Sequence, residues 1–254
     1  MFSYRLLPEQ NQGIGIAFTD RWGGHSRGSF GELNLGRTDV DEPAAVAANF
    51  REVAAAIGVE HLAATRQTHS TIVHTVRDAV HWPPGAELGD SLPGGRRLPQ
   101  ADALITRAVG VALCIRVADC VPVVLADPQA RVVAAAHAGR VGLAAGVLDA
   151  TVDALLGAGA RQLTAWIGPH VCGRCYEVPT EMADQVAAQI PASRSQTRHA
   201  TAALDLGAGC AQVLRARQVQ VYDVSRCTLE SPDLYSHRRD GAGAGRLVGL
   251  IWLG

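Results

Sequence analysis

Apolar runs of strand length fill the middle third of the chain. Val111–Val117 and Val121–Ala126 are almost continuously apolar, which predicts strands that are buried on both faces. The turn residues Asp127-Pro128-Gln129-Ala130 separate them from a third strand-like run, Arg131–Ala136. Two strands joined by so short a turn must be antiparallel, so we expect a mixed sheet.

Apolar positions at helical spacing predict several helices. The first covers Ala44–Ile57, begins after Pro43 and stops at Gly58. The other expected helices are Val141–Leu156, Glu181–Ala188 and Ala203–Arg217, and the other expected strands are Gly13–Phe18, Thr71–Val76, Leu163–Ile167, Val219–Tyr222 and Arg246–Leu253. His81–Gln100 is rich in Pro, Gly and Arg and predicts a surface loop. This alternation predicts an α/β (α+β) fold: a single layered domain, residues 1–254, with mixed sheets flanked by helices.

Composition narrows the class of protein. The net charge is -1, so no basic excess indicates a nucleic-acid partner, and no long uncharged apolar run predicts a membrane span. The N-terminus, Met1-Phe2-Ser3-Tyr4-Arg5, has no apolar core of a signal peptide, and six cysteines are too few for a disulfide scaffold. We therefore expect a cytoplasmic protein with reduced thiols.

Lysine is absent from the sequence. This excludes Schiff-base chemistry and the phosphate-binding lysine of a P-loop. Any bound anion must be held by arginine, by backbone amides or by the N-terminus of a helix.

Three short segments carry the candidate chemistry. Arg66-Gln67-Thr68-His69, Ala118-Asp119-Cys120 and Ala136-His137-Ala138-Gly139 each lie beside a strand-like run and supply two imidazoles and a thiol. Catalytic zinc is commonly held by three such ligands with one open position, whereas structural zinc has four. Each residue also has an ordinary interpretation. Cys120 can be a small buried residue, His137 a hydrogen-bonded residue at a strand end, and His69 a surface side chain.

A further motif, His170-x-Cys172-x-x-Cys175, contains a CxxC pattern that can indicate redox activity or zinc. A structural zinc would need more ligands than the motif supplies, and redox cysteines normally open a helix after a strand. The sequence therefore favours incidental cysteines here.

Several motifs in the same order resemble one known family. The resemblance is carried by Gln67-Thr68-His69, by Ala101-Asp102-Ala103-Leu104-Ile105-Thr106 and by the segments around Cys120 and His137. It continues with Ile167-Gly168-Pro169 and Tyr176-Glu177-Val178, and then with Cys227-Thr228, Ser236-His237-Arg238-Arg239-Asp240-Gly241 and Gly245-Arg246. The chain resembles the YfiH family, also called the multicopper polyphenol oxidase (laccase-domain) family and later described as purine nucleoside phosphorylases.

The resemblance implies a layered fold similar to that of a cysteine-dependent toxin deamidase, and a zinc site at His69, Cys120 and His137. It implies phosphorolysis of adenosine, inosine, guanosine and methylthioadenosine, together with deamination of adenosine. Older descriptions of the family imply copper and phenol oxidation. The chain departs from the family pattern after Gly139, where Arg140 replaces a common tryptophan.

Candidate substrate contacts are few. Arg51, Arg238 and Arg239 are candidates for holding phosphate, although surface arginines are commonly just solvated. Asn34, after a glycine-rich loop, is a candidate for contacting ribose, although asparagine is also a turn residue.

Three functions stay open from the sequence. The first is a zinc-dependent purine nucleoside phosphorylase with deaminase activity, with purine nucleoside and phosphate as partners. The second is a copper-dependent polyphenol oxidase, but multicopper clusters need many histidines and the chain has no His-x-His. The third is a cysteine hydrolase with Cys120 as nucleophile and His137 as base.

Overall fold

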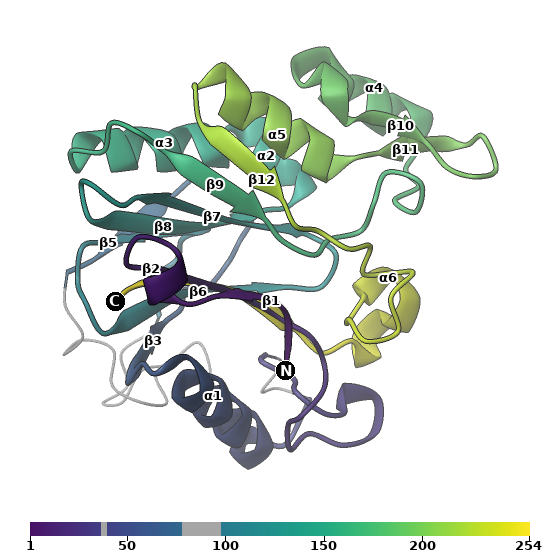
Figure 1. Ribbon diagram of the computed structural model, residues 1–254. Helices are drawn as coiled ribbons and strands as arrows, with labels where there is room; N and C mark the ends of the chain where they lie inside the picture. Colours follow the sequence, from purple (N-terminus) through teal and green to yellow (C-terminus); the bar gives the residue numbers. More distant parts are fainter. Residues whose placement is uncertain (37–39, 78–97) are drawn as a thin grey trace.

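The computed structural model describes residues 1–36, 40–77 and 98–254. Its secondary structure forms four layers: a group of helices, a six-stranded sheet, a five-stranded sheet and one long helix (Figure 1). The layering and the mixed sheets confirm the predicted fold class, while the extent of the domain stays a prediction.

Most strands belong to the two large sheets. The five-stranded sheet has the order β1-β2-β13-β6-β3 and the six-stranded sheet the order β12-β9-β7-β8-β5-β4. A small hairpin of β10 and β11 is separate. The strands are β1 Phe2–Leu6, β2 Ile14–Thr19, β3 His61–Ala63, β4 Val73–Val76, β5 Ala103–Thr106, β6 Val111–Val117, β7 Val121–Asp127, β8 Val132–Ala138, β9 Thr164–Ile167, β10 Arg194–Gln196, β11 Ala202–Leu204, β12 Gln220–Asp223 and β13 Leu247–Leu253.

Both faces of the central strands are buried, as their apolar runs predict. On β7, Val123 and Leu125 point to the helix side, whereas Val124 and Ala126 point between the sheets. β6 and β13 alternate in the same way between the space between the sheets and the single long helix. The predicted hairpin is present, because β7 pairs antiparallel with β8 across the turn after Asp127.

Helices cover the outer face of each sheet. α1 Pro43–Ile57 packs on the five-stranded sheet through residues such as Val46, Phe50 and Val53. The six-stranded sheet is covered by α2 Arg140–Ala145, α3 Val147–Gly157 and α5 Leu206–Ala216, whereas α4 Thr180–Gln189 packs on the β10–β11 hairpin and α2. A short α6, His237–Asp240, lies near the end of the chain. Within the described residues, no helix is long and apolar enough to cross a membrane.

Three details differ from the sequence prediction. The helix expected over 141–156 is broken at Gly146, whose φ of 96° is left-handed and ends α2. The helix expected from Ala203 begins only at Leu206, because Asp205 caps its N-terminus and the preceding residues form β11. The surface loop predicted over 81–100 lies outside the described residues up to position 97.

Candidate functional site

His69, Cys120 and His137 come together at one end of the six-stranded sheet. Cys120 directly precedes β7, His137 is near the end of the neighbouring antiparallel β8, and His69 lies just before β4. Their ligand atoms all lie within 4.8 Å of one another, with Cys120 Sγ 3.8 Å from His69 Nε2. The structure thus brings together the three residues that the sequence singled out.

Asp102 holds this cluster in place through hydrogen bonds. Its side chain is fully buried just before β5, and Oδ1 accepts hydrogen bonds from His137 Nδ1 at 2.8 Å and from the His69 amide at 2.9 Å. Oδ2 accepts from the Thr68 amide and from the amide and hydroxyl of Ser70. One carboxylate therefore fixes the His137 ring and the loop that carries His69.

The hydrogen bond to Asp102 also decides which nitrogen His137 presents. With Nδ1 donating to the carboxylate, Nε2 is left to face the site, which is the arrangement that supports histidine ligands to metals. Burial acts to raise the pKa of Asp102, but the hydrogen bonds from His137, Ser70 and Thr68 outweigh it and hold that pKa well below its ordinary value. Asp102 is thus an anion that orients an imidazole.

The backbone is strained at His69 and at Asp119, the residue before Cys120. His69 has a φ of 60° and Asp119 a φ of 91°, in the left-handed region that side chains other than glycine rarely adopt. The contacts to Asp102 hold the first, and the Asp119 carboxylate, which accepts from Thr228 Oγ1 at 2.6 Å and from the Arg238 amide at 2.6 Å, holds the second. Local strain maintained by surrounding contacts is typical of functional sites.

In the metal-free protein, the Cys120 thiol and the His137 imidazole shift each other's pKa. Burial acts to raise the pKa of Cys120, but His137 and His69 outweigh it and lower that pKa to about 6. Burial acts to lower the pKa of His137, but Asp102 and Cys120 raise it to about 9. Between these values the pair is a thiolate facing an imidazolium.

This pairing predicts a reactive thiol in the metal-free protein. Alkylation of Cys120 by iodoacetamide should reach half its maximal rate near pH 6, because below the pKa of about 6 the thiolate is protonated and above it the rate is constant up to about pH 9. Peptide mass spectrometry over pH 5–9 measures the rate. In His137→Ala the midpoint should move to higher pH. A wild-type rate that rises only above pH 8 would contradict the pairing.

The absence of a side chain at Gly139 provides the space that His69 and Cys120 occupy. A Cβ at this position would overlap His69 Cδ2 and lie 2.8 Å from His69 Nε2 and 3.1 Å from Cys120 Sγ. Real Cβ atoms do not approach so closely, and the neighbouring atoms are the candidate ligands themselves. Only glycine fits here without moving them.

Gly139→Ala should therefore displace His69 and weaken metal binding by roughly tenfold, the lower end of the effect of groups that orient ligands. Competition with a chromogenic chelator measures the affinity. Gly157→Ala is the matched control, because a Cβ there meets no atom within 4 Å. Equal affinities for the two variants would show that Gly139 does not shape the site.

A cavity of about 700 Å³ opens over the three residues. Arginines Arg66, Arg116 and Arg246 line it together with Gln67 and His237. Its volume lies within the range of small-molecule binding sites.

These lining arginines are not the ones chosen from the sequence. Arg116 is the one charged residue of the otherwise apolar β6, and this exception in the sequence could have indicated a functional residue. Gln67 pairs its side-chain amide with the backbone N–H and C=O of Arg116, at 2.9 and 2.8 Å, and so fixes the His69 loop against β6.

The four substrate-contact candidates are not among the residues that line this cavity. Arg51 is on the exposed side of α1, and Arg239 donates to Asp240 and to backbone carbonyls including that of Thr228. Arg238 stacks over Tyr176 at 4.9 Å, donates to the Glu177 carbonyl and lines a different cavity.

Asn34 is fully buried, and its side chain is hydrogen-bonded to neighbouring protein groups. Its Oδ1 accepts from the backbone amides of Gly36 and Arg246, and its Nδ2 donates to Asp41. Asn34 therefore positions the backbone of a cavity arginine. Substrate contact by these four residues stays a prediction.

The donor set fits a zinc ion. Two imidazole nitrogens and one thiolate are the ligand types of zinc, three of them leave an open position, and a buried carboxylate supports one histidine. The sulfur and nitrogen atoms lie within 4.8 Å of one another, close enough to share one ion.

Comparisons with known proteins agree over nearly the whole chain. A purine nucleoside phosphorylase of Streptomyces griseus is 46% identical over 243 residues, covering 94% of this chain and 94% of that protein. One of Streptomyces coelicolor is 44% identical and covers 95% and 96%. The crystal structure of a Neisseria meningitidis protein matches with a TM-score of 0.79 and 33% identity, covering 95% of this chain and 94% of that one.

The crystal structure of the hypothetical protein YfiH of Bacillus licheniformis matches with a TM-score of 0.83 and 27% identity, covering 98% and 96% of the two chains. The profile of the family described as multi-copper polyphenol oxidoreductase laccase matches residues 15–254. With its layered fold, its histidine–cysteine cluster and these relatives, the chain belongs to the multi-copper polyphenol oxidoreductase laccase family.

Proposed function

We propose that this protein is a zinc-dependent purine nucleoside phosphorylase that also deaminates adenosine. The observation that carries the proposal is the cluster of His69, Cys120 and His137 on the floor of an arginine-lined cavity. Relatives up to 46% identical that are named purine nucleoside phosphorylase support the same substrate class. Adenosine, inosine, guanosine and methylthioadenosine are the proposed nucleosides.

Phosphorolysis breaks the glycosidic bond between the purine nitrogen and C1 of the ribose. A phosphate oxygen forms the new bond to C1, so the products are free base and ribose 1-phosphate. The nitrogen of the departing base keeps the electron pair of the broken bond and takes up a proton. The site must therefore bind a phosphate anion and support the leaving base.

The cavity arginines suit the phosphate. Arg66, Arg116 and Arg246 line the cavity, and guanidinium binds phosphate oxygens through paired N–H donors. Arg116 is held by its own donation to the Thr65 carbonyl at 2.8 Å, and Arg246 by donations to the carbonyls of Ala244 and Gly245. This supports a preorganised anion site next to Cys120 and His137.

The cluster residues have separate tasks. His69, Cys120 and His137 would hold zinc, and Asp102 would keep His137 Nε2 turned toward the site. Zinc bound there would supply Lewis acidity, which polarises a nearby group and lowers the pKa of water. Deamination of adenosine consumes one water and releases ammonia, so the two proposed reactions use one cavity in different ways.

Zinc fits better than a copper cluster. Among the described residues, neither group of potential ligands contains more than two histidines, whereas multicopper clusters use many. Copper in the His69–Cys120–His137 site would still bind tightly, since copper(II) exceeds zinc in the affinity order of divalent metals. Phenol oxidation would then depend on copper loading.

One observation favours a second candidate function. A thiolate facing an imidazole that is oriented by a carboxylate is also the arrangement of a cysteine hydrolase, with Cys120, His137 and Asp102 in the three roles. This function predicts full activity after zinc removal. The phosphorylase requires the metal.

The test is chromatography of the products from a mixture of purine nucleosides, with and without phosphate. The proposal expects free bases and ribose 1-phosphate only when phosphate is present, and inosine with ammonia from adenosine. Zinc-loaded, copper-free protein that releases no base with phosphate but oxidises a phenol rapidly would overturn it.

An arginine variant makes the test specific to the cavity. Arg116→Ala should raise the KM for phosphate by roughly tenfold or more, because a charged hydrogen-bond donor to the anion is lost. Arg194→Ala is the control, since Arg194 pairs with Asp184 on the surface. An unchanged KM in Arg116→Ala would remove this arginine from the phosphate site.

A further inference from the structure

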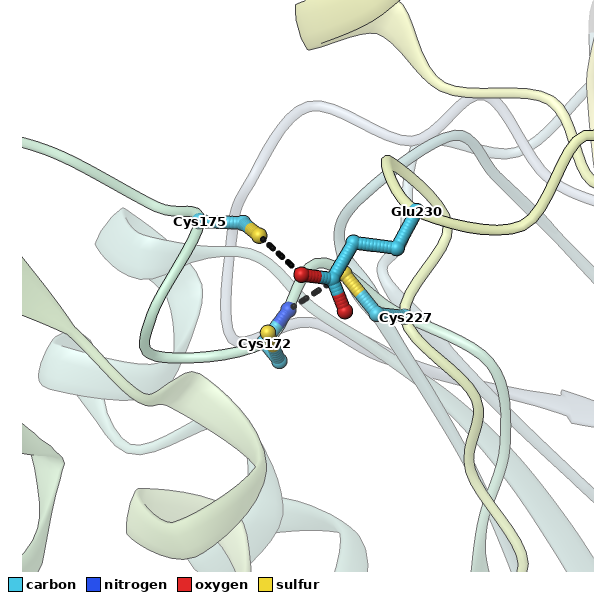
Figure 2. A group of neighbouring side chains, drawn as sticks. All are labelled: Cys172, Cys175, Cys227 and Glu230. Carbon is cyan, nitrogen blue, oxygen red and sulfur yellow. Dashed lines mark hydrogen bonds between the residues drawn. The ribbon is translucent and has the colours of Figure 1, made fainter. Parts of the chain in front are cut away.

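Outside the first site, a second group of metal-binding side chains gathers in the structure. Cys172, Cys175, Cys227 and Glu230 each direct one ligand atom toward a common point, and these atoms lie within 4.8 Å of one another. In Figure 2 the first two come from one loop, the other two from another, and all four side chains converge. The sequence alone left the CxxC motif without further ligands; the fold supplies a third thiol and a carboxylate.

The two loops are built alike. Cys172 and Cys175 bracket a turn in which the Cys175 amide donates to the Cys172 carbonyl at 2.9 Å. Cys227 and Glu230 have the same spacing, on a turn in which the Ser231 amide donates to the Cys227 carbonyl at 3.0 Å. Paired ligands at such short spacing on tight turns are the usual way in which structural zinc is held.

Backbone pairing fixes the two turns against each other. His170 and Cys227 form a parallel bridge, in which the His170 amide donates to the Arg226 carbonyl and the Thr228 amide to the His170 carbonyl. The Cys172 amide also points at Cys227 Sγ, at 3.5 Å. The ligand positions are therefore set by main-chain contacts and do not depend on a bound ion to bring them near.

The contacts within the group are those that a cation would replace. The Cys175 thiol donates to Glu230 Oε1 at 3.3 Å, and Arg198 forms an ion pair with the same oxygen. The thiols are half-buried, and a single guanidinium is the described cation paired with the group. Zinc–sulfur bonds of about 2.3 Å put tetrahedral ligand atoms roughly 3.8 Å apart, so movements of about 1 Å would close the site.

We propose that Cys172, Cys175, Cys227 and Glu230 form a second metal site, which binds a zinc-type divalent cation in four-coordinate geometry. Binding releases three thiol protons to solvent and leaves three thiolates and one carboxylate on the metal. With all four positions filled by protein, the site is structural. It ties the loop after β9 to the segment that leads into α6.

The second site is separate from the cluster in the cavity, but Asp119 connects the two. Thr228, next to Cys227, donates to Asp119 Oδ1, and the Val171 amide donates to the Asp119 carbonyl at 3.1 Å. Asp119 directly precedes Cys120. The second metal would thus hold the loops that brace Cys120, and its presence does not depend on the proposed phosphorylase activity.

Metal counting on the full chain, purified without chelator, tests the proposal. Wild type should contain about two zinc ions per chain, and both Cys120→Ala and Cys227→Ala about one. Cys210→Ala is the matched control and should keep both, because Cys210 is fully buried in the helix-side core and belongs to neither group of candidate ligands.

A spectroscopic measurement avoids reliance on variants of the second site. Cobalt(II) added to metal-free Cys120→Ala should give intense thiolate-to-cobalt charge-transfer bands from three sulfurs, and these bands should be lost on alkylation of the thiols. Cys120→Ala that folds but binds no cobalt, or a native mass showing a disulfide among Cys172, Cys175 and Cys227, would overturn the proposal. Wild-type protein that holds two zinc ions per chain but does not cleave nucleosides would instead overturn the proposed function.

Discussion

Replacing Cys120 by alanine is expected to abolish nucleoside phosphorolysis, with a fall in kcat/KM of roughly 10³-fold or more, the size seen when a group at a reacting centre is removed. The thiolate is the one anionic ligand in the cluster, and its sulfur lies 3.8 Å from His69 Nε2. Without it, two neutral imidazoles must hold the cation alone. The zinc content should fall by about one ion per chain in the same preparation.

Cys210→Ala provides the comparison for this variant. It removes the same atom from a fully buried position in the helix-side core, so it should lose some stability and keep its activity. Circular dichroism and thermal unfolding establish that both variants fold. If Cys120→Ala kept its zinc and its rate of phosphorolysis, the cluster would not be the reacting centre.

Asp102→Asn is expected to weaken metal binding and activity by about 10–100-fold, the usual effect of losing a group that orients a ligand. The substitution keeps the shape of the side chain but removes the charge. Asp102 accepts five hydrogen bonds, from His137, Ser70 and the amides of Thr68 and His69. An amide nitrogen in place of one oxygen would face these donors, so His137 would lose its orientation.

Stability must be separated from this effect on the site. The lost hydrogen bonds should also cost roughly 1–3 kcal/mol in the free energy of unfolding, because buried donors are left without an acceptor. Asp127→Asn is the matched control, since Asp127 is also buried and accepts from four backbone amides, those of Gln129, Ala130, Arg161 and Gln162. It should lose similar stability and leave zinc affinity unchanged. Equal zinc affinities in the two variants would show that Asp102 has no role in the site beyond folding.

The sequence predicted the central part of the fold because the evidence for it was local. Continuous apolar runs on either side of Asp127 predicted a buried hairpin, and β7 and β8 form it. Gly146 was harder, since an isolated glycine in a helical pattern is commonly tolerated, yet here its left-handed φ divides the helix. Short edge elements such as β3 and β10 have too few residues for a periodic pattern.

The site was predictable only in part. His69, Cys120 and His137 were recognisable by residue type and by the family motifs, but nothing local indicated that Asp102 binds two segments that are 33 and 35 positions away. The cavity arginines were missed for the same reason. Arg238 and Arg239 stood out in the sequence as a pair, whereas the fold gives them structural contacts and brings Arg66, Arg116 and Arg246 to the cavity.

The most direct measurement of the central claim follows labelled oxygen through the reaction. Inosine is incubated with the zinc-loaded protein and fully ¹⁸O-labelled phosphate in ordinary water, and the sugar product is analysed by mass spectrometry. Cleavage by phosphate predicts ribose 1-phosphate that keeps every labelled oxygen, formed in equal amount with hypoxanthine and lost in Cys120→Ala. Free ribose carrying oxygen from water, at the same rate with and without phosphate, would show hydrolysis and contradict the account.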